Sequence, residues 1–384
     1  MQSIYLDHAA TTPLRPEVRE AMAPYLGERF GNPSSVHRWG REARAALEDA
    51  RERVAAALGA GRREVVFTGG GTEADNLAVL GRWRAARRAG WPGPVVCSAV
   101  EHKAVLGAVR EAGREGAEVV YLAVDEEGRV LLDAVDEALA ARPSVVSVMW
   151  GNNEVGTLQP VAEIGARCRS AGVVFHSDAV QAFGKVRVRV DEVPVDLLTI
   201  SAHKIGGPKG IGALYVRSGV EVVPLTHGGG QEWGLRPGTE NVAAAVGFAV
   251  AAELAVREQE AEAARLAALR DRLEQGLKER VPGLVVNGGG AARLPHLLDV
   301  SVPDVDQEAI LVALDLEGIA VSSGSACQSG TVEPSHVLVA MGRARENEAS
   351  LRLSLGRTTT EEDVAQVIER FPAVVARVRE LAGL

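Results

Sequence analysis

The sequence has few cysteines, no long apolar run and no recognisable export signal. Its 384 residues include only three cysteines, Cys97, Cys168 and Cys327. Three thiols cannot form a disulfide framework, so we expect a reducing compartment. The longest apolar run, residues 242–252, is too short to cross a bilayer, and the first residues lack the basic and apolar segments of a secretion signal. These absences predict a cytoplasmic protein with no membrane segment.

Acidic residues outnumber basic ones, 51 to 42, and lysine is scarce. The formal net charge is −9 at pH 7 and the pI is about 5.5, which argues against a surface that binds nucleic acid. Lysine occurs only at Lys103, Lys185, Lys204, Lys209 and Lys278. If the chemistry of the protein requires an amine, these side chains are the candidates.

The length and the apolar pattern predict an α/β protein. Between about residues 60 and 217, short apolar runs alternate with segments of helical periodicity, a pattern typical of a mostly parallel sheet with helices on both faces. Such sheets bind ligands at the carboxyl ends of their strands. The expected strands are 64–68, 94–100, 118–124, 144–150, 172–178, 195–202 and 211–217, and the expected helices include 75–88, 104–113 and 161–171.

A second, smaller domain is expected after a long helix. Residues 241–280 are rich in alanine and glutamate and contain no proline. Strand patterns then return at 296–302, 319–323 and 350–356. Because 384 residues exceed one ordinary core, we predict a large domain of residues 16–255. Residues 1–15 and 256–384 would form the smaller α+β domain.

Three strand ends carry side chains suited to one cofactor. The turn GGGTEADN follows strand 64–68 and opens a helix, so its N–H groups and Thr72 could bind phosphate. Asp178 ends strand 172–178, and Lys204 follows strand 195–202 in a Gly/Pro turn, where burial would lower its pKa. Each feature taken alone has a simpler alternative: the glycine-rich turn could bind no ligand, Asp178 could cap a helix, and Lys204 could be solvated. Together the three predict pyridoxal phosphate, held by its phosphate, its pyridine nitrogen and a Schiff base.

Motifs along nearly the whole chain resemble the cysteine desulfurases of the class V aminotransferase family, which are fold-type I pyridoxal-phosphate enzymes. The matching segments are YLDHAATTPL (5–14), FGNPSSVHRWGREAR (30–44), EHKAVL (101–106), NNEVGTLQP (152–160), HSDAVQAFGK (176–185), SAHKIGGPKGIGALYVR (201–217), GTEN (238–241), SSGSACQSG (322–330) and RLSLGRTTTEED (352–363). The SSGSAC segment resembles the housekeeping group, which supplies sulfur for iron–sulfur clusters and tRNA thiolation. The resemblance implies a fold-type I architecture and a pyridoxal 5'-phosphate cofactor.

The resemblance also implies residue roles. Lys204 would form the Schiff base, Asp178 would pair with the pyridine nitrogen, and His102 would stack on the ring and transfer protons. Because Thr239 would reach the phosphate of a neighbouring subunit, a homodimer is implied. The remaining implied contacts are Asn153 and Gln181 to the phenolic oxygen, Gly71, Thr72, Ser201 and His203 to the phosphate, and Arg352 with Asn32 to the substrate carboxylate.

Cys327 stands alone in AVSSGSACQSG (320–330). The resemblance implies that its thiolate takes sulfur from L-cysteine, which leaves L-alanine and a persulfide for acceptor proteins such as an iron–sulfur scaffold. A free thiol has a pKa of about 8.5, so positive groups or His102 would have to raise the thiolate share. Gly324 and Gly330 are expected hinges, because one sulfur must reach both the cofactor and a partner. Whether Cys327 also ligates a transient iron–sulfur cluster stays open.

Other functions remain possible from the sequence. A selenocysteine lyase or another class V aminotransferase is the nearest alternative, and an aminotransferase would not need Cys327. A dinucleotide-binding protein could use the turn at 69–71, and a structural partner in cluster assembly is a third possibility. Gly206, Trp233 and Pro237 replace the tyrosine, arginine and serine that are commoner in the family. These departures concern the polarity of the pocket and partner docking.

Overall fold

The computed structural model describes residues 3–324 and 334–381, and a seven-stranded sheet forms its centre. The strand order is β2-β8-β7-β6-β5-β3-β4. All neighbouring pairs are parallel except those of β8, which runs antiparallel to β2 and β7. The predicted mostly parallel sheet is therefore confirmed. Its strands are β2 Val65–Thr68, β3 Val95–Ser98, β4 Val119–Leu122, β5 Val145–Ser147, β6 Phe175–Asp178, β7 Leu197–Ser201 and β8 Gly212–Val216.

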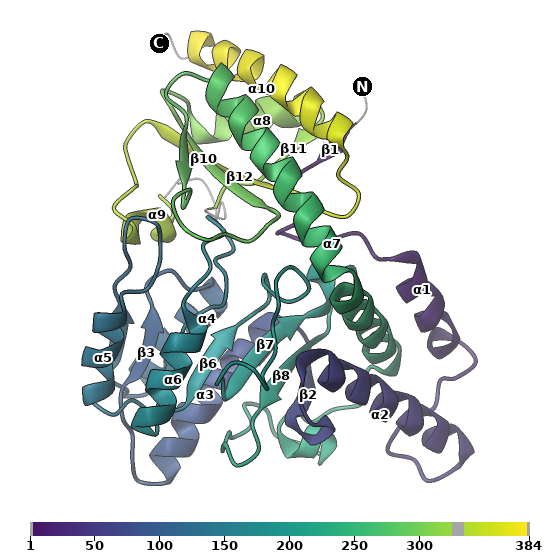
Figure 1. The fold of residues 1–384 in the computed structure, drawn as a ribbon. Helices are drawn as coiled ribbons and strands as arrows, with labels where there is room; N and C mark the ends of the chain where they lie inside the picture. The colour runs from purple at the N-terminus through teal and green to yellow at the C-terminus, as the bar shows by residue number, and fades with distance from the viewer. Residues whose placement is uncertain (1–2, 325–333, 382–384) are drawn as a thin grey trace.

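Helices cover both faces of this sheet (Figure 1). Trp83 and Val109 pack helices α3 and α4 against one face, whereas Leu58, Ile164 and Phe248 belong to the core on the other. Every residue of β2, β3, β5, β6 and β7 is buried, which explains the mostly apolar sequences of β2, β3, β5 and β7. The helices of this part are α1 Pro16–Met22, α2 Arg38–Leu58, α3 Gly71–Arg88, α4 Lys103–Arg114, α5 Leu132–Ala140 and α6 Val161–Ala171.

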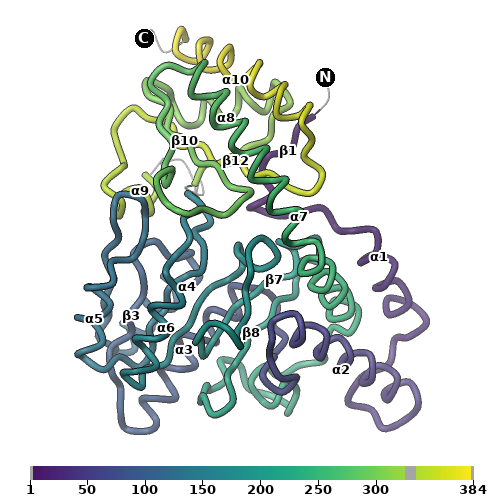
Figure 2. Tube along the Cα trace, in the orientation of Figure 1, coloured from purple at the N-terminus to yellow at the C-terminus, as the bar shows by residue number. Residues whose placement is uncertain are grey.

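A second core lies at the end of the molecule where both termini are found (Figure 2). Its three-stranded antiparallel sheet has the order β12-β10-β9, and β1 pairs in parallel with β11. The N-terminal strand thus joins the C-terminal part of the chain, while the domain boundaries at residues 15 and 255 stay predictions. The elements are β1 Ile4–Tyr5, β9 Val285–Asn287, β10 Leu297–Pro303, α8 Gln307–Leu316, β11 Ile319–Ala320, α9 His336–Ala340, β12 Glu348–Ser354 and α10 Glu361–Leu381.

Helix α7, Val242–Arg280, connects the two cores (Figure 1). Asn241 caps it, because its side-chain oxygen accepts the N–H of Ala244 at 3.0 Å. Its first turns, to Leu254, are buried in the core of the large sheet, and Leu266 begins the stretch buried in the second core. Among the helices of residues 3–324 and 334–381, none has the length and hydropathy to span a bilayer.

Candidate active site

A cavity of about 220 Å³ opens at the carboxyl ends of the parallel strands, where α/β sheets place their ligands. Every residue for which the sequence predicts a cofactor contact lines this cavity, except Thr239. The lining residues are Gly71, Thr72, Asp75, His102, Met149, Gly151, Asn153, Asp178, Val180, Gln181, Ser201, His203 and Lys204. The sequence had assigned no role to Asp75, Met149, Gly151 or Val180.

The turn between β2 and α3 forms one end of the cavity. Gly70 has φ +152°, and a Cβ on Gly71 would lie 3.0 Å from Val180 and 3.7 Å from Cβ of Ser201. Gly71, at the N-terminus of α3, and Ser201 both line the cavity, and a side chain on Gly71 would crowd this end. The buried Oγ of Ser201 has no hydrogen-bond partner in the described chain. Because an unpaired buried hydroxyl is costly, this end of the cavity fits an anionic ligand such as a phosphate.

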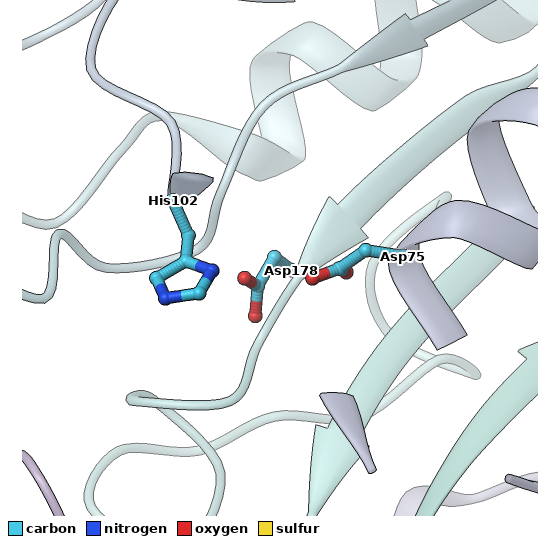
Figure 3. Close-up of side chains that lie close together, drawn as sticks. All are labelled: Asp75, His102 and Asp178. Carbon is cyan, nitrogen blue, oxygen red and sulfur yellow. The ribbon is translucent and has the colours of Figure 1, made fainter. Parts of the chain in front are cut away.

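Asp178 lies at the end of β6 and is 5% exposed. Its Oδ1 accepts the N–H of Val180 at 2.8 Å. Asp178 therefore caps the following turn, a role close to the helix cap that was the alternative to cofactor binding. Burial raises the pKa of Asp178, and the opposing effects of His102 and Lys204 favour its charged form. Figure 3 shows its carboxyl group between the side chains of His102 and Asp75. A carboxylate here is suited to a cationic ring nitrogen.

His102 caps helix α4 and also faces the cavity. Its Nδ1 accepts the N–H of Ala104 at 3.2 Å, and its ring points toward Asp178 (Figure 3). Burial lowers the pKa of His102, and Asp178 acts in the opposite direction. Because the ring of His102 lines the cavity, it is suited to stacking on an aromatic ligand bound there.

Lys204 follows β7 in the short helix Ala202–Lys204. Its Nζ donates to the carbonyl oxygens of Ala9 and Ala10. Burial lowers the pKa of Lys204 to about 8, as expected for the Gly/Pro turn, and Arg352 also lowers it. Gln181 Nε2 donates to the carbonyl oxygen of Ala9 at 2.8 Å. The N-terminal DHAATT segment therefore closes this side of the cavity, a role that its sequence did not reveal.

Arg352 extends from β12 toward the same region. Leu351 and Leu353 point into the second core, so the alternation along the strand places Arg352 on the other face, as predicted. Its Nη2 lies 3.0 Å from Oδ1 of Asp7, and its Nη1 donates to the carbonyl oxygen of Asn153 at 2.9 Å. The guanidinium is thus held beside a cavity residue by a carboxylate that the sequence did not identify.

Not all predicted residues meet at the cavity. Asn32 lies in the loop before α2, where its Oδ1 accepts the N–H of Ser34 at 2.9 Å, and neither it nor Thr239 lines the cavity. Cys327 and Gly330 lie outside the described residues. Within the described ranges, one group of ligand atoms has metal-like spacing, Asp75, His102 and Asp178 within 4.8 Å of one another.

The other two cysteines are structural, as predicted. Cys97 lies on β3 and Cys168 on α6, and both are fully buried. Burial raises the pKa of Cys168 to about 12 and that of Cys97 well above its usual range. Neither is present as a reactive thiolate near neutral pH.

Two of the family departures have structural reasons. Gly206 has φ +80°, and a Cβ there would lie 2.5 Å from Cγ of Arg15, which occupies that space. Trp233 has φ +55°, and its ring lies 4.5 Å from the guanidinium carbon of Arg51. A Cβ on Gly228 would lie 3.1 Å from Cβ of Pro237, which does not explain the proline.

Comparisons with known proteins agree with the resemblance. The family model for aminotransferase class-V matches residues 4–367. The chain is 46% identical to "Cysteine desulfurase IscS" of Dictyoglomus turgidum, over 99% of this chain and 96% of that protein.

Solved structures are similar as well. A "NifS-like protein" superposes with a TM-score of 0.91 at 35% identity, covering 98% of this chain and 100% of the other. A structure described as "SspA in complex with cysteine" has a TM-score of 0.79 at 36% identity, covering 92% and 99%. The sequence-based resemblance and the fold-type I architecture are confirmed by these matches.

Proposed function

Because the chain belongs to the class V aminotransferase family, we propose that it is a cysteine desulfurase dependent on pyridoxal 5'-phosphate. It removes sulfur from L-cysteine and yields L-alanine and a persulfide on Cys327. Relatives with that name match over essentially the whole chain. The observation that carries the proposal is that Lys204 and Asp178 face one cavity, which also contains the unpaired Ser201 hydroxyl and the N-terminus of α3.

The cavity supplies a partner for each polar part of the cofactor. Lys204 would hold the aldehyde covalently and Asp178 the pyridine nitrogen. Gly71, Thr72 and Ser201 are suited to the phosphate, with His102 against the ring. When bound, pyridoxal phosphate supplies an electron sink for the carbon atoms of an amino-acid substrate.

Lys204 is the proposed base at the substrate α-carbon. With a pKa of about 8, a useful share of its amine is neutral near neutral pH and can accept that proton. The carbonyl oxygens of Ala9 and Ala10 hold Nζ at the cavity. Asp178, kept anionic beside His102 and Lys204, retains a proton on the ring nitrogen.

Arg352 is the proposed partner of the substrate carboxylate. A guanidinium binds a carboxylate through two parallel hydrogen bonds, and Arg352 already binds one carboxylate, that of Asp7. Asn153 connects this guanidinium to the cavity through its backbone carbonyl. The solved relative described as a complex with cysteine supports cysteine as the amino acid that is bound.

Cys327 is the proposed sulfur acceptor. Its thiolate attacks the substrate sulfur, the substrate C–S bond breaks, and the new S–S bond leaves a persulfide on the protein. The carbon fragment keeps the electron pair of the broken bond, gains a proton and leaves as L-alanine. An acceptor thiol on a partner, such as an iron–sulfur scaffold, then takes the sulfur. Thr239 is proposed to act in the site of a second subunit of a homodimer.

The test is to incubate the cofactor-loaded protein with L-cysteine, quantify L-alanine and measure the masses of the cysteine-containing peptides by mass spectrometry. We expect a gain of one sulfur atom on the Cys327 peptide. Lys204→Ala should release no L-alanine, and Cys327→Ala should lose both the persulfide and sulfide release. Cys168→Ala, which changes a buried thiol, should keep them. Full turnover in Cys327→Ala would overturn the proposal in favour of an aminotransferase.

A further inference from the structure

Asp75 is a buried acid in the cavity that the proposed mechanism does not use. It lies in the first turns of α3 and is 1% exposed. Figure 3 shows its carboxyl group beside that of Asp178. Oxygen atoms of both acids and a ring nitrogen of His102 lie within 4.8 Å of one another. Two carboxyl groups this close and this dry cannot both be charged, so one of them holds a proton.

No cation compensates Asp75. Its only ion-pair contact within the described residues is His176, whose Nε2 lies 3.6 Å from Oδ1. Burial lowers the pKa of His176 to about 3, and its two ring nitrogens bind the hydroxyls of Ser147 and Thr199 at 2.8 and 3.1 Å. His176 is therefore neutral. The other titratable group facing Asp75 is the buried acid Glu101, which adds negative charge.

Asp178 has cationic neighbours that Asp75 lacks; the group that favours the charged form of Asp75 is the hydroxyl of Thr199, which lowers its pKa less than burial and Asp178 raise it. Asp178 accepts the N–H of Val180, and His102 and Lys204 both favour its charged form. Burial, followed by the charge of Asp178, raises the pKa of Asp75 well above its usual range. This difference in neighbours favours the proton on Asp75 and the charge on Asp178.

We propose that Asp75 is a positioning residue, which stays protonated and donates a hydrogen bond to Asp178. This inference rests on the proposed function, in which Asp178 pairs with the pyridine nitrogen. The donated bond stabilises the carboxylate form of Asp178, so a shared proton stays on the ring nitrogen rather than moving to the acid. It also fixes the orientation of a carboxylate that stands at the end of a strand.

The proton on Asp75 can be observed without any cofactor. Infrared difference spectra of the cofactor-free protein at neutral pH should contain the carbonyl-stretch band of a buried carboxylic acid that is lost in Asp75→Asn. Asp271→Asn, which changes an exposed acid, is the control and should leave this band in place. If the Asp75→Asn spectrum loses no acid band, Asp75 is ionised and the inference is overturned.

The effect on Asp178 is read from the pH titration of the visible absorption of the lysine-bound cofactor. Asp75→Asn keeps an N–H donor of the same shape, so its midpoint should match that of the parent. Asp75→Leu has a similar volume without a donor. Its midpoint should rise by about one pH unit, because a proton withdrawn from the ring leaves less positive charge near the imine. Equal shifts in both variants, or none in Asp75→Leu, would overturn the inference.

A replacement variant and a cofactor control distinguish failure of this inference from misfolding and from failure of the proposed function. If Asp75→Leu does not fold, Asp75→Ala provides the variant without a donor. If the proposed function itself is wrong, the parent will show no absorption that depends on Lys204, as tested with Lys204→Ala. The infrared result does not depend on that absorption, and so the two failures are distinguishable.

Discussion

Burial sets the charge of the individual side chains around the cavity. The same loss of water lowers the pKa of Lys204 to about 8 and that of His203 to about 4, because both are cationic when protonated. It raises the pKa of the acids Asp75 and Asp178. The cavity therefore combines an amine that can lose its proton with neutral imidazoles and one retained negative charge, a combination suited to moving protons on a bound ligand.

The first prediction concerns the protonation of Lys204. Its neutral amine must attack the cofactor aldehyde, so the rate of cofactor binding to cofactor-free protein should rise with pH. The rise should level off near pH 8, the pKa of Lys204, rather than near the value of about 10.4 for a solvated lysine. Stopped-flow absorbance across a pH series measures the midpoint.

Arg352 supplies the matched variant for this prediction. Burial is the larger cause of the lowered Lys204 pKa and the charge of Arg352 the next. Arg352→Gln should therefore move the midpoint upward by part of the distance to the solvated value. Arg377→Gln, in a half-exposed ion pair with Glu317, should leave it unchanged. A parent midpoint near that of free lysine would contradict the buried position of Nζ.

The residues that sequence reasoning found are those at strand ends. Asp178 ends a predicted strand and Lys204 follows one in a Gly/Pro turn, positions that are visible in the sequence alone. Asp75 was missed because it lies inside a helix whose other buried residues are mostly apolar, and only the fold brings it to Asp178. Asp7 was missed because its partner Arg352 lies at the other end of the chain, and only the fold brings the two together.

At the scale of elements, periodicity predicted helices and strands to within a few residues, although α3 begins at Gly71, four residues before the predicted start. Helix α6 has the predicted bounds, and α7 begins one residue after the predicted start at Asn241. Strand β6 begins at Phe175, later than predicted, because Gly172 with φ +68° ends α6 and occupies the expected start of the strand. The sequence does indicate the antiparallel direction of β8, because the connection of residues 202–211 is too short for the crossover helix that a parallel strand requires.

The second prediction concerns the contact between α2 and the short helix Gln231–Gly234. Arg51 and Glu232 form a buried pair with two hydrogen bonds, at 2.6 and 2.7 Å, and Glu232 also accepts the N–H of Phe67. Arg51→Met would leave this carboxylate buried without its cation. We expect the free energy of unfolding to fall by about 3–5 kcal/mol, as measured by urea denaturation.

An exposed pair gives the comparison for Arg51. Arg187 and Glu192 form an ion pair whose side chains are 68% and 44% exposed, so Arg187→Met should destabilise the protein far less than Arg51→Met. A double variant, Arg51→Met with Glu232→Met, should recover part of the loss because no buried charge remains. A loss for Arg51→Met as small as that of Arg187→Met would show that Glu232 is solvated.

At the scale of the whole molecule, the cavity is assembled from distant parts of the chain. Asn153 and Lys204 line it. The carbonyl oxygens of Ala9 and Ala10 bind Lys204, and Arg352 binds the backbone of Asn153. The N-terminal segment reaches the cavity because β1 pairs with β11 in the second core. Helix α7 holds that core against the large sheet. The proposed substrate recognition by Arg352 and proton transfer by Lys204 would thus depend on both cores being folded.

The last prediction concerns the surface of the proposed homodimer. Phe30, Val36 and Trp39 are 74%, 88% and 52% exposed, which is unusual for three large apolar side chains in one short segment. A cavity of about 490 Å³ is lined both by this segment and by Trp233. The segment therefore adjoins the loop that carries Thr239, the residue proposed to act in the partner's site.

If this surface is the dimer contact, charge placed on it should separate the subunits, because interface cores exclude unpaired charges. Phe30→Asp with Val36→Asp should sediment as a monomer, whereas the parent should sediment as a dimer. The control is Val312→Asp with Leu316→Asp on α8, at side chains that are 59% and 77% exposed, and it should remain dimeric. A dimeric first variant would place the contact elsewhere. If it is monomeric and binds the cofactor less tightly than the control, the result would support a Thr239 contact across the interface.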